Sequence, residues 1–343
     1  MHIHGLSLLV ADALSITSVH TQKGIVRAAL AARVSVKKLA SIVSELARRC
    51  PRATPVRDLR AFSVNLVVAK CSLVPSDLGV WLAYEITSAC SHYKFFYTPV
   101  EEVVKLIERS GCKIIDYVSQ IPVTPIGKPI SLQVWRLESI NGFNRARLPK
   151  PFKVRSTSLP LSLIVLALHE SSPWLPLSAY ESAKAIIMPS GAENIRFKIP
   201  LRLLVRAHNT CVNSKAIMGG YSHPLLWNGC TSFLVILPRD ELKTIYLLAA
   251  LNRAAVALYS GVERVYATLC VRPSSIEEFT RLVRSLGGVY ERLVSVIRYP
   301  IPWYQYSPRE CSWSTKPRRG VEALRDFVKE GLIEIVGGTG VTL

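Results

Sequence analysis

The pattern of apolar and polar positions is clearest in the last third of the chain. Residues 233–237 are a continuous apolar run, as in a buried strand, and a helical pattern follows directly. The pattern predicts a strand at 233–237, a helix at 240–259 closed by Gly261, and a strand at 262–271. A second helix then begins at the capping box 274–277 and ends at Gly287–Gly288, and a strand follows at 290–297. This β-α-β-α-β order is close to a ferredoxin-like unit that lacks one recognisable strand.

The first 140 residues show the same mixture of periods less clearly. Alternation or apolar runs predict strands at 2–10, 62–68, 113–118 and 130–137. Helical periodicity predicts helices at 24–49, from Ser76 through Ile86, and from the capping box 98–101 to Leu106. The segment 92–97, HYKFFY, is expected to pack between two helices. These elements predict a mixed α/β domain.

A break in composition separates the two regions. Residues 141–160 contain three prolines, a glycine and five basic residues without an acid, which is typical of a linker. Helices are expected at 161–169 and 178–187, a strand with a basic face at 195–199, and a helix and a hairpin at 321–329 and 332–343. The predicted fold class is therefore α+β, with an N-terminal domain at 1–140, a basic linker at 141–160 and a second domain at 161–343.

The segment 24–49 has two interpretations. As a helix-turn-helix at 25–49, it would place Lys37 and Lys38 toward phosphate or bases. The turn of that motif needs a left-handed residue, and here the position is Arg33, at a cost of about 1 kcal/mol relative to glycine. A single amphipathic helix avoids this cost, so both interpretations remain open. The closing residues, 323–343, could add the last helix and wing of a winged-helix domain.

Charge narrows the class of partner. The chain has 43 basic and 24 acidic residues, a formal net charge of +19 and a pI of about 9.8. Self-repulsion of this size favours a polyanionic partner, nucleic acid first and an anionic membrane surface second. No run reaches the roughly 20 apolar residues of a spanning helix, and the first twelve residues do not resemble a signal peptide. A cytoplasmic protein is expected, and the low glutamine and methionine content suggests a thermophile.

An aromatic and basic loop at 299–319 is the strongest candidate for contact with nucleic acid. Aromatic side chains stack on bases and flanking arginines or lysines neutralise phosphates. The loop residues that fit this combination are Trp303, Tyr304, Tyr306, Arg309, Trp313, Lys316, Arg318 and Arg319. The basic linker adds Arg145, Arg147, Lys150, Lys153 and Arg155. The alternative is that the aromatic residues cover a domain core and the charges are solvated.

Signals of enzyme chemistry are sparse. The GGTG at 337–340 has no helix behind it to hold a phosphate, and the aspartates are scattered. Arg202 and His208 have the spacing used by some metal-independent ribonucleases. No two of the eight cysteines lie within four residues of each other, so no zinc knuckle is predicted, and no metal or cofactor is expected.

These observations predict a non-catalytic protein that binds DNA or RNA through backbone charge and base stacking. Such a protein would work with other protein subunits in a larger nucleoprotein complex, for instance an archaeal RNA-guided antiviral assembly. Two alternatives remain: a metal-independent RNA-processing nuclease using His208 or another histidine, and a helix-turn-helix DNA-binding regulator.

Overall fold

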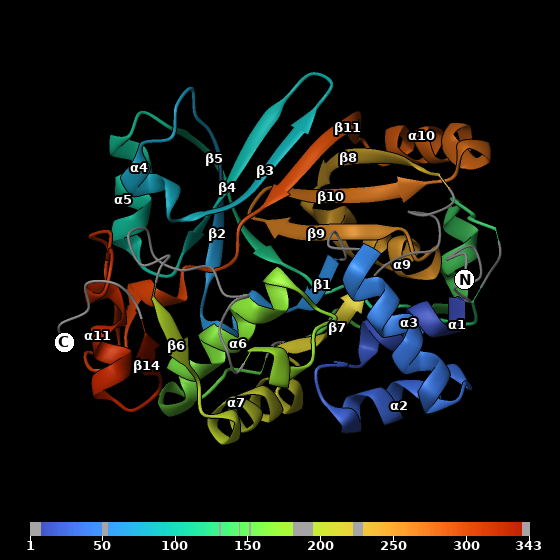
Figure 1. Cartoon of the computed structure of the whole chain (residues 1–343). Coiled ribbons are helices and arrows are strands. Elements are labelled where there is room, and N and C mark those ends of the chain that lie inside the picture. The colour runs from blue at the N-terminus through green and yellow to red at the C-terminus, as the bar shows by residue number, and fades with distance from the viewer. Residues whose placement is uncertain are drawn as a thin grey trace.

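A closed, eight-stranded antiparallel barrel forms the centre of the protein (Figure 1). The computed structural model describes residues 8–49, 54–129, 132–143, 145–150, 152–180, 195–221 and 229–337. The strand order around the barrel is β10-β8-β11-β3-β4-β2-β5-β9, and β9 pairs with β10 to close it. The large antiparallel sheet and its helices confirm a mixed α/β protein.

The barrel consists of two consecutive β-α-β-β-α-β halves. The first half contains β2 (Asn65–Lys70), α4 (Ser76–Gly79), β3 (Leu82–Ser88), β4 (His92–Thr98), α5 (Glu101–Arg109) and β5 (Lys113–Gln120). The second contains β8 (Thr231–Pro238), α9 (Leu242–Leu251), β9 (Ala255–Gly261), β10 (Arg264–Val271), α10 (Ile276–Ser285) and β11 (Val289–Arg298). Counted in chain order within each half, the strands lie side by side as 2-3-1-4 in both. The halves join where β11 pairs with β3 and β5 pairs with β9.

The basic linker therefore connects two halves of one barrel. Strands on both sides of residues 141–160 share the same closed sheet. The described linker residues are irregular apart from the 3-10 helices η3 (Leu137–Phe143) and η4 (Ser156–Ser158) and the first two residues of a helix that begins at Leu159.

Different layers cover the two halves. Apolar side chains of α9 and α10 form one core with the second half, as the amphipathic pattern of the sequence predicts. The core of the first half includes residues from α6 (Leu159–Ser171), α7 (Leu201–Asn213), α11 (Glu322–Lys329) and the segment 301–306. These elements are distant in sequence from the strands of the first half, whose own helix α4 is only one turn long.

Three N-terminal helices form a third cluster below the barrel in the view of Figure 1. They are α1 (Leu8–Ile16), α2 (Gln22–Ala32) and α3 (Val36–Arg49), referred to below as the N-terminal helices. A two-stranded ribbon, β1 (Thr54–Arg57) paired with β7 (Ile217–Tyr221), lies between these helices and the barrel. Short strands complete the molecule: β6 (Arg196–Lys198), β12 (Tyr306–Ser307), β13 (Ser312–Trp313) and β14 (Glu334–Gly337).

Several predicted elements are wrong. The helix expected at 240–259 ends at Leu251 and is followed by the strand β9, because the chain turns at Arg253 with a left-handed φ of 52°. The helix expected from Ser76 to Ile86 is the single turn α4 followed by β3, and HYKFFY is the strand β4. The strand expected at 130–137 is absent from its described residues, 132–137.

The ends of the chain also differ from the prediction. Leu8 to Val10, expected in a strand, belong to α1, and residues 2–7 lie outside the described residues. The segment 24–49 forms two helices, so the single-helix interpretation is wrong. Arg33 between them is left-handed, with a φ of 54°, and its backbone N–H bonds to the Ala29 and Leu30 carbonyls. β14 pairs with β6 rather than within a hairpin, and residues 338–343 are not described.

Two disulfides join neighbouring strands of the barrel. Cys71–Cys112 links the end of β2 to the start of β5, and Cys230–Cys270 links the start of β8 to the end of β10. Each half of the barrel thus carries one covalent link. In the described part of the chain, no helix is both long enough and apolar enough to cross a membrane.

Candidate functional site

The aromatic residues of the loop 299–319 belong to the core. Trp303, Tyr304 and Tyr306 are 0%, 7% and 2% exposed. Trp303 packs edge-on against Phe327 of α11, with ring centroids 4.9 Å apart, and its neighbours cover the first half of the barrel. Trp313 is half-buried, with its ring 5.9 Å from that of Trp81. A base cannot stack on side chains whose faces are already packed, so the predicted stacking surface is wrong for the three buried residues.

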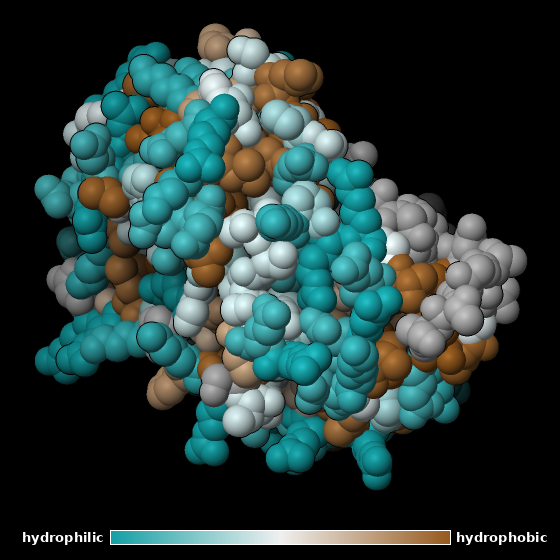
Figure 2. Space-filling view, turned by 90° about the vertical axis from the view of Figure 1, so that its left-hand side faces the viewer, coloured by the Kyte–Doolittle hydropathy of each residue, from teal (hydrophilic) through white to brown (hydrophobic). Residues whose placement is uncertain are grey.

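The basic residues of this loop divide into two groups. Arg318 forms an ion pair of 2.6 Å with Asp326, and Arg319 one of 3.2 Å with Asp77. Arg309 and Lys316 are exposed. On the side of the molecule that carries α4, α5 and α11, hydrophilic residues cover much of the surface and apolar ones are dispersed among them (Figure 2). This distribution is that of an ordinary solvated surface.

The other predicted contact residues are exposed but separate from the loop in sequence and element. Lys37 and Lys38 lie in the first turn of α3. The exposed basic side chains of the linker are Arg145, Arg147, Lys150, Lys153 and Arg155.

The pair proposed for a nuclease does not form a site. His208 lies on α7 with 2% of its surface exposed, and its Nε2 is 3.4 Å from the Ser18 hydroxyl. Arg202 is on the same helix but exposed. A buried imidazole cannot take a proton from a polynucleotide, so this alternative is wrong.

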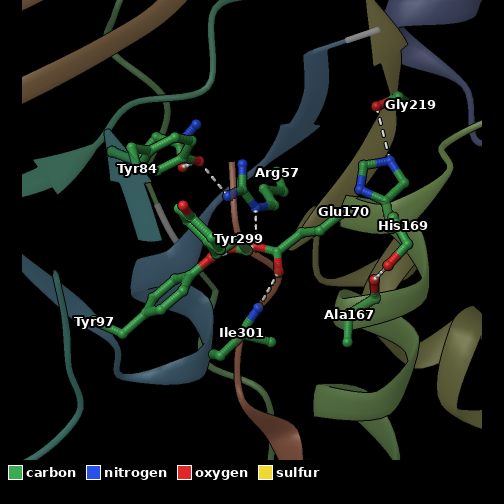
Figure 3. A network of polar contacts seen from close by, with 11 residues as sticks. Arg57, Tyr84, Tyr97, Ala167, His169, Glu170, Gly219, Tyr299 and Ile301 are labelled. Carbon is green, nitrogen blue, oxygen red and sulfur yellow. Dashed lines mark hydrogen bonds and ion pairs between the residues drawn. The ribbon is translucent and has the colours of Figure 1, made fainter. Parts of the chain in front are cut away.

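A buried ion pair lies at one end of the barrel instead (Figure 3). Arg57, the last residue of β1, and Glu170, near the end of α6, are 2% and 4% exposed in their side chains. The Arg57 Nε donates to Glu170 Oε1 at 2.6 Å. The second carboxylate oxygen of Glu170 accepts from the Ile301 backbone N–H at 2.5 Å. A buried ion pair is stable only when such further hydrogen bonds compensate for desolvation.

Tyrosines from the first half of the barrel extend this network. Tyr84 of β3 accepts a hydrogen bond from Arg57 Nη2, and its hydroxyl donates to Gln120 of β5 at 3.3 Å. Tyr97 of β4 lies 3.2 Å from Glu170 Oε1 and donates to the Tyr299 carbonyl at 2.9 Å. The network therefore ties β1, β3, β4, α6 and the start of the aromatic segment together.

A second arginine faces the same region from the other half. Arg298, the last residue of β11, donates from Nη2 to the Thr54 hydroxyl at 3.1 Å. Inside the barrel Tyr84 and Tyr259 lie with ring centroids 5.6 Å apart, and Tyr259 and Phe95 4.7 Å apart. The two guanidinium groups are thus held above an aromatic barrel interior.

Two adjoining cavities lie beside these groups, each with room for about one water molecule. The lining of the inner cavity includes Arg57, Tyr84, Gln120, Tyr259, Thr268 and Arg298, together with the apolar residues Ile86, Val256 and Val296. The outer cavity shares Arg57 and Gln120 with it and adds apolar side chains, among them Ile121, Pro122, Val123 and Leu258. Both guanidinium groups therefore line the inner cavity, and aliphatic side chains line much of the outer one.

Three groups on the wall of the inner cavity lack a partner. The Arg57 Nη1 group and the Thr268 and Tyr259 hydroxyls are buried, and within the described structure none of them makes a hydrogen bond. Leaving a buried donor unsatisfied costs about 1–3 kcal/mol, more when it is charged. An acceptor placed in the cavity would remove this cost.

Burial controls the protonation of the site. Burial lowers the pKa of Arg298, although Tyr84 and Tyr259 act in the opposite direction. Burial would also lower the pKa of Arg57, but the Tyr84 hydroxyl and the Glu170 carboxylate raise it well above its ordinary value. Burial raises the pKa of the Tyr97 and Tyr259 hydroxyls. At neutral pH the site consequently holds charged guanidinium groups and neutral phenols.

Three buried imidazoles lie next to this network. They belong to His20, between α1 and α2, His169 on α6 and His208 on α7, and form the histidine cluster. The ring of His20 is 5.6 Å from that of His169 and 5.5 Å from that of His208, between centroids. His169 directly precedes Glu170, and its Nε2 lies 2.8 Å from the Gly219 carbonyl on β7 (Figure 3). Among the described residues, no group of three or more His, Cys, Asp or Glu side chains is arranged to hold a metal ion.

Sequence reasoning missed every residue of this site. Arg57 and Arg298 are two among 43 basic residues, and Glu170 ends an apolar helix where an acid looks solvated. One signal was present in the sequence: the helix 159–171 is almost wholly apolar until His169 and Glu170. Two consecutive polar residues on a helix that is buried all round must face other polar groups.

Comparison with known proteins finds little similarity. No protein-family model matches the chain, and no curated protein matches it. A crystal structure of the siroheme decarboxylase NirDL is similar with a TM-score of 0.41 and 11% identity, over 88% of this chain and 96% of that one. NirDL in complex with an iron-uroporphyrin III analogue gives a TM-score of 0.39 and 10% identity, over 94% and 96% of the two chains. Similarity this low supports no inference about activity.

The burial of the aromatic loop contradicts the predicted function. A non-catalytic nucleic-acid-binding protein was expected because its aromatic loop should be open to bases, and the loop is instead the cover of a core. The prediction is wrong.

Proposed function

We propose that the protein binds a small organic carboxylate at the end of the barrel, between Arg57 and Arg298. The observation that carries the proposal is the pair of unsatisfied donors, Arg57 Nη1 and Thr268 Oγ1, on the wall of one cavity. Both require an acceptor, and an anionic acceptor gives the stronger hydrogen bond to a guanidinium group.

Charge favours an anion over water. The two charged residues among those that line the inner cavity are both arginines. Glu170 neutralises part of this charge through its ion pair with Arg57. A carboxylate oxygen in the cavity would lie beside both guanidinium groups.

Size and polarity favour a carboxylate with a short apolar remainder. The inner cavity accepts about one oxygen-sized group, and the outer cavity continues it with aliphatic walls. A phosphate has four oxygens and no apolar part, so it would leave polar atoms against Val256 and Leu258. The closed barrel supports this proposal, because a site enclosed between strands can bury most of a small ligand.

Calorimetric titration of the purified protein tests the proposal. Acetate should bind at pH 7, whereas acetamide, which has the same shape without the charge, should not. Arg298→Gln should weaken acetate binding about 10–100-fold, the value of a charged hydrogen bond of about 1.5–3 kcal/mol. Arg264→Gln is the matched control, since Arg264 lies on the barrel strand β10 but is exposed.

Equal acetate affinity in the wild type and Arg298→Gln would contradict the assignment of the site. Binding of phosphate with the same dependence on Arg298, and no binding of acetate, would replace the carboxylate with a phosphate as the ligand class. An absence of binding by any of these anions would contradict the proposed function itself.

A further inference from the structure

We propose that protonation of the histidine cluster detaches the N-terminal helices together with the β1–β7 ribbon and so weakens ligand binding in acid. The effect on binding rests on the proposed function. The detachment itself does not, and it can be measured without ligand.

The cluster lies at the junction between the N-terminal helices and the rest of the protein. His20 is 3% exposed, and its backbone carbonyl accepts from the Leu177 N–H at 2.9 Å. Its ring faces His169 of α6 and His208 of α7. Ser18, two residues earlier, contacts His208 Nε2. Nearby, Trp174 packs into the apolar cluster of the N-terminal helices.

The same junction holds the ribbon that carries Arg57. His169 contacts the Gly219 carbonyl on β7, and Gly219 pairs with Val56, the residue before Arg57 on β1. On its other side Gly219 lies against α1, because a Cβ at this position would be 2.1 Å from the Leu14 carbonyl oxygen. The adjacent residues His169 and Glu170 thus fix the ribbon to α6, one through β7 and the other through Arg57.

The junction requires neutral imidazoles. The Nδ1 atoms of His169 and His208 are buried and, in the described structure, make no hydrogen bond, so a proton added there would have no acceptor. If two of the three imidazoles were protonated, their positive charges would lie on neighbouring rings and repel each other. The charge of Arg57 on β1, which is paired with Glu170, also disfavours a proton on His169. A hydrogen bond with the Leu175 backbone acts in the opposite direction on His20, because it favours the protonated ring.

The direction of the pH effect follows from the pKa values. Burial lowers the pKa of His20 to about 3 and that of His208 to about 4, and it holds the pKa of His169 well below 6.5. The docked form therefore binds fewer protons than a detached form whose histidines titrate near 6.5. The docked form is fully favoured above pH 6.5, and it loses stability as the pH falls toward 4. With one proton gained by each of three histidines, the detached population should rise about 1000-fold per pH unit in this window.

Hydrogen–deuterium exchange of the ligand-free protein tests the detachment. Exchange rates corrected for intrinsic chemistry should rise between pH 6 and 4 in peptides of α2 and α3, with a log–log slope near three. Peptides of α9 and α10, in the core of the second half, are the internal reference and should stay protected. A slope of zero, or a simultaneous rise in both sets of peptides, would overturn the proposal.

Variants identify the titrating groups. His208→Asn removes one titrating ring and should reduce the slope by about one, whereas His92→Asn should leave it unchanged because His92 is 47% exposed. If His208→Asn does not fold, the slope of the wild type still decides between three protons and none. His20→Gln provides a second variant with the same expected reduction.

The link to binding needs a ligand that stays ionised in acid. Trifluoroacetate meets this requirement, so its affinity should fall between pH 6 and 4 in parallel with the exchange of α2 and α3. An affinity that stays constant while the helices detach would overturn the link to the site. If trifluoroacetate fails to bind even at pH 7, the proposed function fails and the exchange experiment still decides the detachment.

Discussion

The two halves of the barrel have the same strand order but are completed in different ways. The second half is covered by its own helices α9 and α10. The first half has a single turn, α4, in the corresponding place, and its core is completed by α6, α7, α11 and the aromatic segment, all distant in sequence. Long-range packing brings Glu170 and Ile301 beside Arg57, so the candidate site arises from segments that are distant in sequence.

The comparison also explains why the segment 299–319 is rich in aromatic residues. Trp303, Tyr304 and Tyr306 are buried in the core of the first half, which its own helices do not complete. Prolines and aromatic residues make an effective cover because they are rigid and bury large areas at low entropic cost.

Removal of a disulfide should cause a large loss of the free energy of unfolding, and the loss should be similar in the two halves of the barrel. The bonds span 41 and 40 residues, so each is expected to stabilise the folded protein by about 4 kcal/mol through the entropy of the unfolded chain. Denaturant unfolding of Cys71→Ser and Cys230→Ser measures each bond. A much larger loss for one of them would show that the halves differ in covalent support as well.

Trp303→Ala should expose the dependence of the first half on its distant cover. Truncation of a fully buried tryptophan costs about 3–5 kcal/mol. Trp313→Ala, at a half-buried position of the same segment, should cost less. Denaturant unfolding with near-ultraviolet circular dichroism follows both variants. Similar small losses would mean that the segment is not part of the core.

Glu170→Gln should cost about 3 kcal/mol, because it leaves the Arg57 charge buried without its counter-ion. Glu277→Gln is the matched control in the second half. Its ion pair with Arg281 is exposed, at 87% and 76%, and such pairs contribute about 0–1 kcal/mol. Equal effects of the two substitutions on the free energy of unfolding would remove the distinction between a buried and a surface pair.

The sequence predicted the second half better than the first for a physical reason. The second half follows its local patterns, with apolar runs for β8 and β10 and a helix that ends at glycines. Its one missed strand, β9, begins after a left-handed turn at Arg253, where glycine would be the usual signal. The side chain of Arg253 compensates for this strain with bonds to Asp12 and to the Ile126, Gly127 and Leu251 carbonyls. None of these partners is visible in a local pattern.

Local sequence patterns are also insufficient to predict the N-terminal turn at Arg33 and the candidate site. Arg33 is also left-handed and not glycine, which is why the sequence left one helix and two helices as alternatives. The site combines β1, α6, β11 and the barrel strands, and no two of its charged residues are close in sequence. Local periodicity predicts elements, but it cannot predict which buried charges meet.

A crystal structure of the protein with trifluoroacetate tests the central claim most directly. The account predicts one carboxylate oxygen in the inner cavity, within about 3 Å of Arg57 Nη1 and the Thr268 hydroxyl, and the rest of the ligand in the outer cavity. Its fluorine atoms should point toward the apolar walls of the outer cavity. A cavity that holds only water, with the ligand absent or bound elsewhere on the surface, would contradict the account.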